Sequence, residues 1–184
     1  IVNEAGQWDV VQLQVKGNIV SVSSGISGCF GVTDKGEIIS STNAIDWKIF
    51  DYNLEYKGFA KQCVFRNILV TDKWITIAAH HEDNTPVALF SSKGNVWTER
   101  SLNYDDDRGV VQFFTGIPND ILYNYFEDEF LLVCDNGQLS VLPTCTKCNE
   151  AITITDKSLW AATYSEDTMI IVGDDFYINT FKIK

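Results

Sequence analysis

The sequence predicts an all-β protein, a β-propeller of about four blades, each made of four antiparallel strands. Helix signals are almost absent, because no long window places apolar residues at the period of a helix. Short runs of β-branched and aromatic residues instead alternate with Gly, Asn and Asp turns, as in WITIAAHH and EFLLVCDNG. The same order of elements recurs along the 184 residues, at a spacing of roughly 40 to 50 residues that is typical of one propeller blade.

The two clearest repeats lie at residues 36–47 and 87–97. Both read as a strand, a Ser-Ser pair, a tight turn and a Trp that opens the next strand. Each is preceded by a run that reads as two further strands, so one repeat contains about four strands. A third unit over 121–154 has the same order of strands, and a fourth unit over 159–183 offers only three.

The strand missing from the fourth unit is expected at the other end of the chain. The run Trp8–Leu13 starts with Trp, as the outer strands at Trp47 and Trp97 do. An N-terminal strand that completes the last blade would leave no unpaired strand edge. The chain is thus expected to be a single domain over 1–184, with blades at 17–51, 57–103, 110–155 and 157–184 plus 7–14.

The turns STNAIDW (41–47) and SSKGNVW (91–97) carry a family resemblance. They resemble degenerate Asp-box turns, the Ser-x-Asp-Gly-x-x-Trp hairpins of sialidase-like (BNR-repeat) and photosystem-assembly-factor-like propellers. The box Asp is replaced by Asn43 and Lys93, and Ala44 stands where the first copy would have Gly. In that family the turn is structural and lies away from the active site, so the resemblance implies a fold rather than an activity.

The number of blades in the complete ring is left open by the sequence. Four blades form a closed ring in hemopexin-like domains, two such chains could pair into an eight-bladed homodimer, and the chain could also be part of a larger propeller. A β-sandwich is the remaining alternative, because it has the same short alternating strands.

The charge balance excludes several classes of partner. Lys and Arg number 14 against 25 Asp and Glu, for a formal net charge of −11. Nucleic acids and anionic lipids both require a basic surface, so we expect neither as a partner. Apolar runs are too short for a spanning helix, so no membrane insertion is expected. Five cysteines, an odd number, leave the compartment open, with a secreted or cell-surface location slightly favoured.

Loops that join strands two and three, and those that join successive blades, open on one face of a propeller. Acidic and tyrosine residues gather in these loops, where carboxylates would attract cations or basic groups and flat rings would stack on sugars. The residues expected to bind a ligand there are Tyr52, Tyr56, Asp83, Tyr104, Asp105, Asp107, Arg108, Asp135 and Asp174. Ca²⁺ is the one cofactor that such an oxygen-rich face would suit. The alternative is that these Asp residues only cap turns.

Histidine and cysteine patterns give no defined metal site. His80 and His81 are adjacent and would point to opposite sides of a strand, so we expect loop histidines rather than a metal pair. Cys145 and Cys148 form a CxxC at the position of the box turn. A small disulfide that tightens the hairpin is the preferred interpretation, and a metal site shared between chains is the alternative.

No catalytic motif stands out. The sequence has no GxSxG, HExxH or phosphate-binding glycine loop. Resemblance to sialidases would imply three arginines around the substrate. The chain has Arg66, Arg100 and Arg108, but only Arg108 is expected to face a central pocket. Arg66 is expected in a loop of the opposite face and Arg100 in an outer strand. The predicted function is therefore a non-enzymatic module that binds a glycan or a protein partner. The alternatives are a carbohydrate-active hydrolase and the structural half of a larger propeller.

Overall fold

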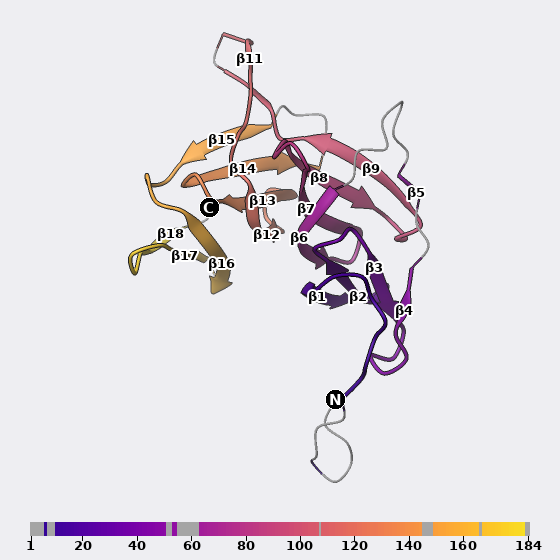
Figure 1. The fold of residues 1–184 in the computed structure, drawn as a ribbon. Coiled ribbons are helices and arrows are strands. Elements are labelled where there is room, and N and C mark those ends of the chain that lie inside the picture. Colours follow the sequence, from indigo (N-terminus) through magenta and orange to yellow (C-terminus); the bar gives the residue numbers. More distant parts are fainter. Residues whose placement is uncertain are drawn as a thin grey trace.

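A computed structural model describes residues 6, 10–50, 53–54, 63–106, 108–144, 149–165 and 167–182, with only the backbone at 53–54 (Figure 1). Every regular element in these residues is a β-strand, and no helix is present among them. Accordingly, the described part of the chain contains no helix that could span a membrane. The all-β prediction is confirmed.

Four small antiparallel sheets account for most of the strands, and we number them as blades 1 to 4. Blade 1 contains β1 (Ile19–Gly25), β2 (Gly28–Thr33), β3 (Ile38–Ser41) and β4 (Lys48–Ile49). Blade 2 contains β6 (Cys63–Val70), β7 (Ile75–His81), β8 (Pro86–Ser91) and β9 (Val96–Ser101), with β5 (Asn53–Leu54) parallel to β9. Blade 3 contains β12 (Pro118–Asn124), β13 (Glu129–Cys134), β14 (Gln138–Pro143) and β15 (Glu150–Thr153). Blade 4 contains β16 (Leu159–Ser165), β17 (Thr168–Gly173) and β18 (Ile178–Lys182).

The four sheets follow one another around a common centre, in chain order, as the blades of a four-bladed β-propeller (Figure 1). Consecutive blades pack through their first strands: β1 and β2 against β6, β6 and β7 against β12, and β12 and β13 against β16. A short hairpin of β10 (Tyr104–Asp105) and β11 (Val111–Gln112) projects from the connection between blades 2 and 3. The predicted fold class is therefore correct.

Each innermost strand has a register shift at the same place. The shifts fall at Ile19/Ser21, Phe65/Asn67, Pro118/Asp120 and Leu159/Ala161. A bulge bends its strand and increases the local twist, so bulges at equivalent positions give the four inner strands the same bend. They also define which residues of different blades are equivalent.

Polar side chains beside these bulges link the blades into a continuous belt of hydrogen bonds. The Ser21 hydroxyl donates to Asn67 Oδ1 at 2.9 Å, and Asn67 Nδ2 donates to Asp120 Oδ1 at 2.7 Å. The other oxygen of Asp120 accepts from the backbone N–H of Ala162 at 2.9 Å. Each of the three junctions is thus crossed by a directed bond, and we call this chain of contacts the inter-blade belt.

Three apolar clusters fill the junctions around this belt. One cluster joins Phe30 and Val32 of blade 1 to Phe65, Ile77 and Trp97 of blade 2. A second lies between blades 2 and 3, and a third between blades 3 and 4. The core is therefore divided among the junctions, as expected for a repeat architecture in which each sheet buries its faces against its neighbours.

The two turns that resemble Asp boxes have the same local geometry. The indole N–H of Trp97 donates to the carbonyl of Gly94 at 2.6 Å, and that of Trp47 donates to the carbonyl of Ala44 at 3.0 Å. Both acceptor residues have a left-handed backbone, with φ of 58° at Ala44 and 84° at Gly94. The repeated turn is thus a structural device that fixes a Trp at the start of the outer strand.

The predicted N-terminal strand is not seen in the described residues. Residues 10–15 form no strand, and blade 4 has three strands, while residues 7–9 lie outside the described part of the chain. The segment is held at the first blade instead, because Lys16 N donates to Glu37 at 2.5 Å and Asn18 N donates to Asp34 at 2.9 Å. These bonds hold the chain beside β1 just before that strand begins.

Candidate functional site

The β10–β11 hairpin is shaped by a single carboxylate, that of Asp106. The backbone N–H groups of Arg108 and Val110 both donate to Asp106 Oδ1 at 2.9 Å. The Arg108 guanidinium and the Gln112 amide donate to Asp106 Oδ2 at 3.0 and 3.1 Å. The Val110 N–H first, and then the Arg108 guanidinium, lower the pKa of Asp106. Asp106 therefore stays ionised while it holds the hairpin in shape.

A cleft of about 640 Å³ lies between this hairpin and the outer strand of blade 3. It is lined by Tyr104, Asp105, Asp106, Gly109, Asn149, Glu150 and Ala151. Asp106 is paired with the Arg108 guanidinium, so the negative potential of the cleft comes from the carboxylates of Asp105 and Glu150. We call it the acidic cleft.

The floor of the acidic cleft is fixed by hydrogen bonds between blades 2 and 3. Asn149 Nδ2 donates to the carbonyls of Ser101 and Asn103, both at 2.8 Å. Arg100 donates to Asn149 Oδ1 and to the carbonyl of Pro143, both at 2.6 Å. The Asn149 side chain is therefore held in place before any ligand arrives, which lowers the cost of binding.

The residues predicted to bind a ligand do not form one group. Tyr104 and Asp105 line the acidic cleft, and Arg108 lies in the adjoining hairpin with an exposed side chain. Because the hairpin packs on β15, these residues lie at the periphery of the propeller rather than around its axis. The positions of Tyr52, Tyr56 and Asp107 lie outside the described residues.

The other predicted residues take part in turns of three different blades. Asp83 accepts from Thr85 N at 3.0 Å, Asp135 from Ile117 N at 2.8 Å, and Asp174 from the Trp160 indole at 2.6 Å. The Asp83 contact is a turn cap of the kind that the alternative describes, whereas Asp135 and Asp174 tie their turns to segments 18 and 14 residues away in the chain.

Sequence reasoning missed Asn149 and Glu150. They come from the start of β15, more than forty positions beyond Tyr104 in the printed sequence. No local pattern connects the two segments, so only the packing of the hairpin on blade 3 brings them together.

A second cleft, of about 460 Å³, lies along the outer part of blade 2. Its lining is formed by Trp74, Phe90, Ser91, Ser92, Val96, Thr98, Glu99, Arg100 and Thr144. The Trp74 and Phe90 rings meet edge to face, with centroids 6.4 Å apart. The Arg100 guanidinium already bonds blade 3, so this mostly apolar cleft offers few groups for chemistry.

The three arginines relevant to the sialidase comparison are dispersed. Arg66 does not lie in a loop, as the sequence suggested, but in the bulge of β6, where it donates to Asn119 of blade 3 at 2.8 Å. Arg100 lies on the outer strand β9, as expected, and Arg108 on the hairpin. They form no common pocket for a substrate carboxylate.

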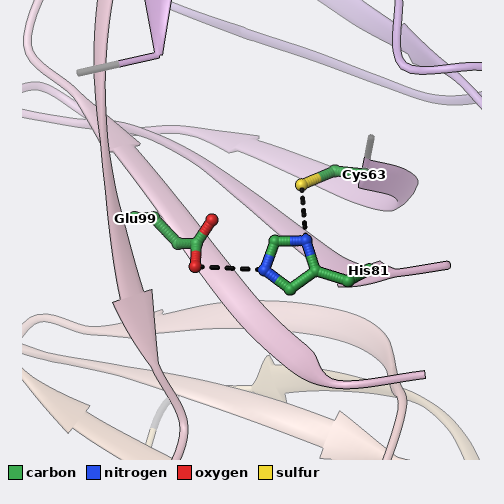
Figure 2. A group of neighbouring side chains, drawn as sticks. All are labelled: Cys63, His81 and Glu99. Atoms are coloured by element: carbon green, nitrogen blue, oxygen red, sulfur yellow. Dashed lines mark hydrogen bonds and ion pairs between the residues drawn. The ribbon is translucent and has the colours of Figure 1, made fainter. Parts of the chain in front are cut away.

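A buried cluster of Cys63, His81 and Glu99 joins three strands of blade 2 (Figure 2). His81 lies in strand β7 and is 6% exposed, so the expectation of a loop histidine is wrong; the strand simply extends further than the polar residues suggested. Its Nδ1 faces Cys63 Sγ at 3.5 Å, and its Nε2 lies 3.1 Å from Glu99 Oε1. The imidazole thus bridges the thiol and the carboxylate.

This cluster is better suited to structure than to catalysis. Burial first, and then the negative charge of Glu99, raise the pKa of the Cys63 thiol to about 11. A thiol with that pKa is protonated near neutral pH and is a poor nucleophile. One ligand atom from each residue lies within 4.8 Å of the others, but the two ring nitrogens serve different partners. These donor types suit zinc in number and kind, but Cys63 and Glu99 lie at opposite nitrogens of the imidazole rather than around one point, and a set that includes Sγ does not suit Ca²⁺.

We expect Cys63 and Cys134 to resist alkylation in the native protein. Both are buried, with 5% and 0% exposure, and burial also raises the pKa of Cys134. Cys29 is only partly buried. Cys145 and Cys148 lie outside the described residues. Of the three described cysteines, treatment with iodoacetamide followed by peptide mass mapping should label Cys29 first, and Cys63 and Cys134 only in denaturant. Rapid native labelling of Cys63 would show an accessible thiolate and contradict the structural role.

Comparisons with known proteins find relatives by structure alone. No family model and no curated protein matches the sequence. The computationally designed Ika4 protein superposes with a TM-score of 0.61 at 10% identity, over 97% of this chain and 99% of that one. The β-propeller domain of Cps50 (Swd1) from Myceliophteria thermophila superposes with a TM-score of 0.64 at 15% identity, over 91% of this chain and 52% of that one. These matches establish the fold. It is a β-propeller.

The extracellular domain of the putative one component system BT4673 from B. thetaiotaomicron also shares this propeller fold. It superposes with a TM-score of 0.63 at 9% identity, over 96% of this chain and 23% of that one. The propeller therefore spans nearly all of Ika4, but about half of the Swd1 domain and a smaller part of BT4673. At such identities the similarity shows the architecture alone.

Proposed function

We propose that this propeller is a non-enzymatic binding or scaffolding module whose acidic cleft holds a basic segment of a protein partner. The observation that carries the proposal is the cleft itself, which the exposed residues Asp105 and Glu150 line together with the partly buried Tyr104. Carboxylates attract Lys and Arg side chains, and an aromatic ring adds a cation–π contact or packs on their aliphatic stems. A net charge of −11 steers such a partner toward the protein.

The fold of the structural neighbours supports a binding role in general terms, because propellers present several rigid loop surfaces. Swd1 is described as a β-propeller domain, and the BT4673 domain is extracellular. A secreted or cell-surface location for the present chain is part of the proposal. A glycan is the second candidate ligand, since Tyr104 and the carboxylates would also suit a sugar ring and its hydroxyls.

The test uses a double variant, Asp105→Asn with Glu150→Gln, which removes two charges from exposed side chains without changing their size. Fluorescence anisotropy with a labelled Lys/Arg-rich peptide should show a Kd raised roughly tenfold, which corresponds to about 1.4 kcal/mol. The wild-type affinity should also fall as salt is added. Titrations with Ca²⁺ and with a chelator show whether a cation contributes.

The matched control is Asp156→Asn with Asp167→Asn, which removes the same charge from exposed loops on either side of β16. It should retain the wild-type Kd. Equal loss in both variants would mean that only net charge matters and would contradict the cleft as the site. A glycan-array screen with a specific hit that the double variant loses would favour the sugar ligand instead.

A further inference from the structure

The two ends of the propeller carry apolar faces that the interior blades bury. The bulges define equivalent pairs of residues on the second and third strands of each blade, on the face toward the next blade. These pairs are Val32–Ile38, Ala78–Ala88, Val133–Leu139 and Val172–Ile178. The first three pairs are at most 3% exposed, whereas Val172 is 37% and Ile178 is 68% exposed. Blade 4 therefore presents a junction face with nothing packed on it among the described residues.

Blade 1 shows the complementary feature on the opposite face. Ile68 of blade 2 and Ile121 of blade 3 face the preceding blade and are 2% and 3% exposed. Val22, which pairs with Gly31 as Ile68 pairs with Ile77, is the equivalent residue of blade 1 and is 62% exposed. Ile49 on the same sheet is 52% exposed. Ile39, which lies between them on this face, is only 1% exposed, so the free apolar surface of blade 1 consists of Val22 and Ile49.

The bulge residues themselves change character at the two ends. In blades 2 and 3 they are Arg66 and Asn119, which bond each other, and Asn119 bonds the Leu159 carbonyl of blade 4 at 2.8 Å. In blades 1 and 4 the bulge residues are Val20 and Trp160, which are 43% and 50% exposed. Val20 has no polar side-chain atom, and the indole N–H of Trp160 already donates to Asp174. An interface could therefore bury these two side chains without leaving a polar group unpaired.

We propose that two copies of this chain associate head to tail, with the free face of blade 4 of each copy packed on the free face of blade 1 of the other. Among the described residues, no packing like that of the three interior junctions joins blade 4 to blade 1 within the chain. Figure 1 shows the two blades at the ends of the array, β1 in indigo and β16 in gold, with the other two blades between them.

The length of the array explains why a second copy fits. The four blades superpose on 52% of the Swd1 chain, and among the described residues they leave the ring open between blade 4 and blade 1, where further blades can be placed (Figure 1). The two end faces differ, which makes each contact heterologous, but a two-fold rotation produces both contacts at once and closes the ring. Closure leaves no free face, so the assembly stops at two chains rather than growing into a fibre.

Sedimentation velocity of the purified chain over a concentration series tests this assembly. The wild-type protein should sediment as a dimer, and Val22→Lys and Ile178→Glu should each be monomeric. Both side chains are largely exposed, so these variants should fold normally, as circular dichroism can verify. Phe113→Lys, at a residue that is 81% exposed away from both faces, is the control and should remain dimeric.

Mixing the two monomeric variants separates head-to-tail assembly from other modes. In the mixture one junction has two unaltered faces and the other pairs Lys at 22 with Glu at 178, so the dimer should reappear. A dimer between two like faces would not be rescued by mixing. A wild-type monomer at every concentration, a series of larger open-ended species, or a failure of the mixture to dimerise would overturn the proposal.

Discussion

Replacing Trp97 by alanine should lower the free energy of unfolding by about 3–5 kcal/mol, the range found for large aromatic residues in cores. Trp97 is fully buried in the junction between blades 1 and 2, where it packs with Phe30 and Phe65. Its indole also ties the turn at Gly94, which has a left-handed backbone. The substitution therefore opens a cavity in the core and releases the turn at the same time.

Urea denaturation measures this effect, and Trp47→Ala is the matched control. Trp47 makes the same indole-to-carbonyl bond, but it is only partly buried, so its loss should be about 1–2 kcal/mol. If Trp97→Ala leaves too little folded protein to measure, Trp97→Phe keeps most of the volume and should still cost more than Trp47→Phe. Equal losses at the two positions would contradict the assignment of Trp97 to the main core.

Replacing Asp120 by alanine should cost about 2–4 kcal/mol, because it removes the centre of the inter-blade belt. The Asp120 carboxylate accepts from Asn67 at 2.7 Å, from Ile121 N at 2.8 Å and from Ala162 N at 2.9 Å. Each donor left without an acceptor in a partly buried site carries a desolvation penalty of about 1–3 kcal/mol. Asp120→Asn retains one acceptor oxygen and should lose less.

The pH dependence of Asp120→Asn provides an independent check. Burial raises the pKa of Asp120 above its ordinary value of 3.8, although the N–H groups of Ala162 and Ile121 partly offset this. Because the pKa is higher in the folded state, the folded protein binds this proton more tightly than the unfolded chain does. Protonation of Asp120 therefore stabilises the fold fully below pH 3.8, and this stabilisation is lost as the pH rises through the pKa of the folded state. As the pH rises through this range, the wild type should therefore lose unfolding free energy relative to Asp120→Asn, which has no carboxyl group to titrate at this position. A constant difference would contradict the raised pKa.

The fold could be predicted from the sequence because its signals are local. Short β-rich runs and the Ser-to-Trp turns at 41–47 and 91–97 suffice to give an all-β repeat protein. The inner-strand bulges were harder to find, since only two copies, Arg66–Leu69 and Asn119–Leu122, resemble each other. The equivalent pairs are Val20–Ser21 in blade 1 and Trp160–Ala161 in blade 4, of which only Ser21 is polar, so the repeat becomes visible only in the register of the strands.

The candidate site could be predicted only in part. Tyr104 and Asp105 were named from local composition, whereas Glu150 reaches the same cleft through the packing of blade 3. The Cys63–His81–Glu99 cluster likewise depends on the pairing of distant strands, which no short motif encodes. The N-terminal strand predicted for blade 4 is not seen at residues 10–15, where the hydrogen bonds of Lys16 and Asn18 hold the chain at blade 1, and residues 7–9 lie outside the described part of the chain.

The central claim is that the acidic cleft is the ligand-binding surface, and amide chemical-shift mapping by NMR tests it most directly. A Lys/Arg-rich peptide added to the isotopically labelled protein should shift the amide signals of Tyr104, Asp105, Gly109, Asn149 and Glu150. The turns of Asp34, Asp135 and Asp174 should stay unchanged. Shifts confined to those turns, or no shifts at a peptide concentration that saturates anisotropy, would contradict the assignment of function to this cleft.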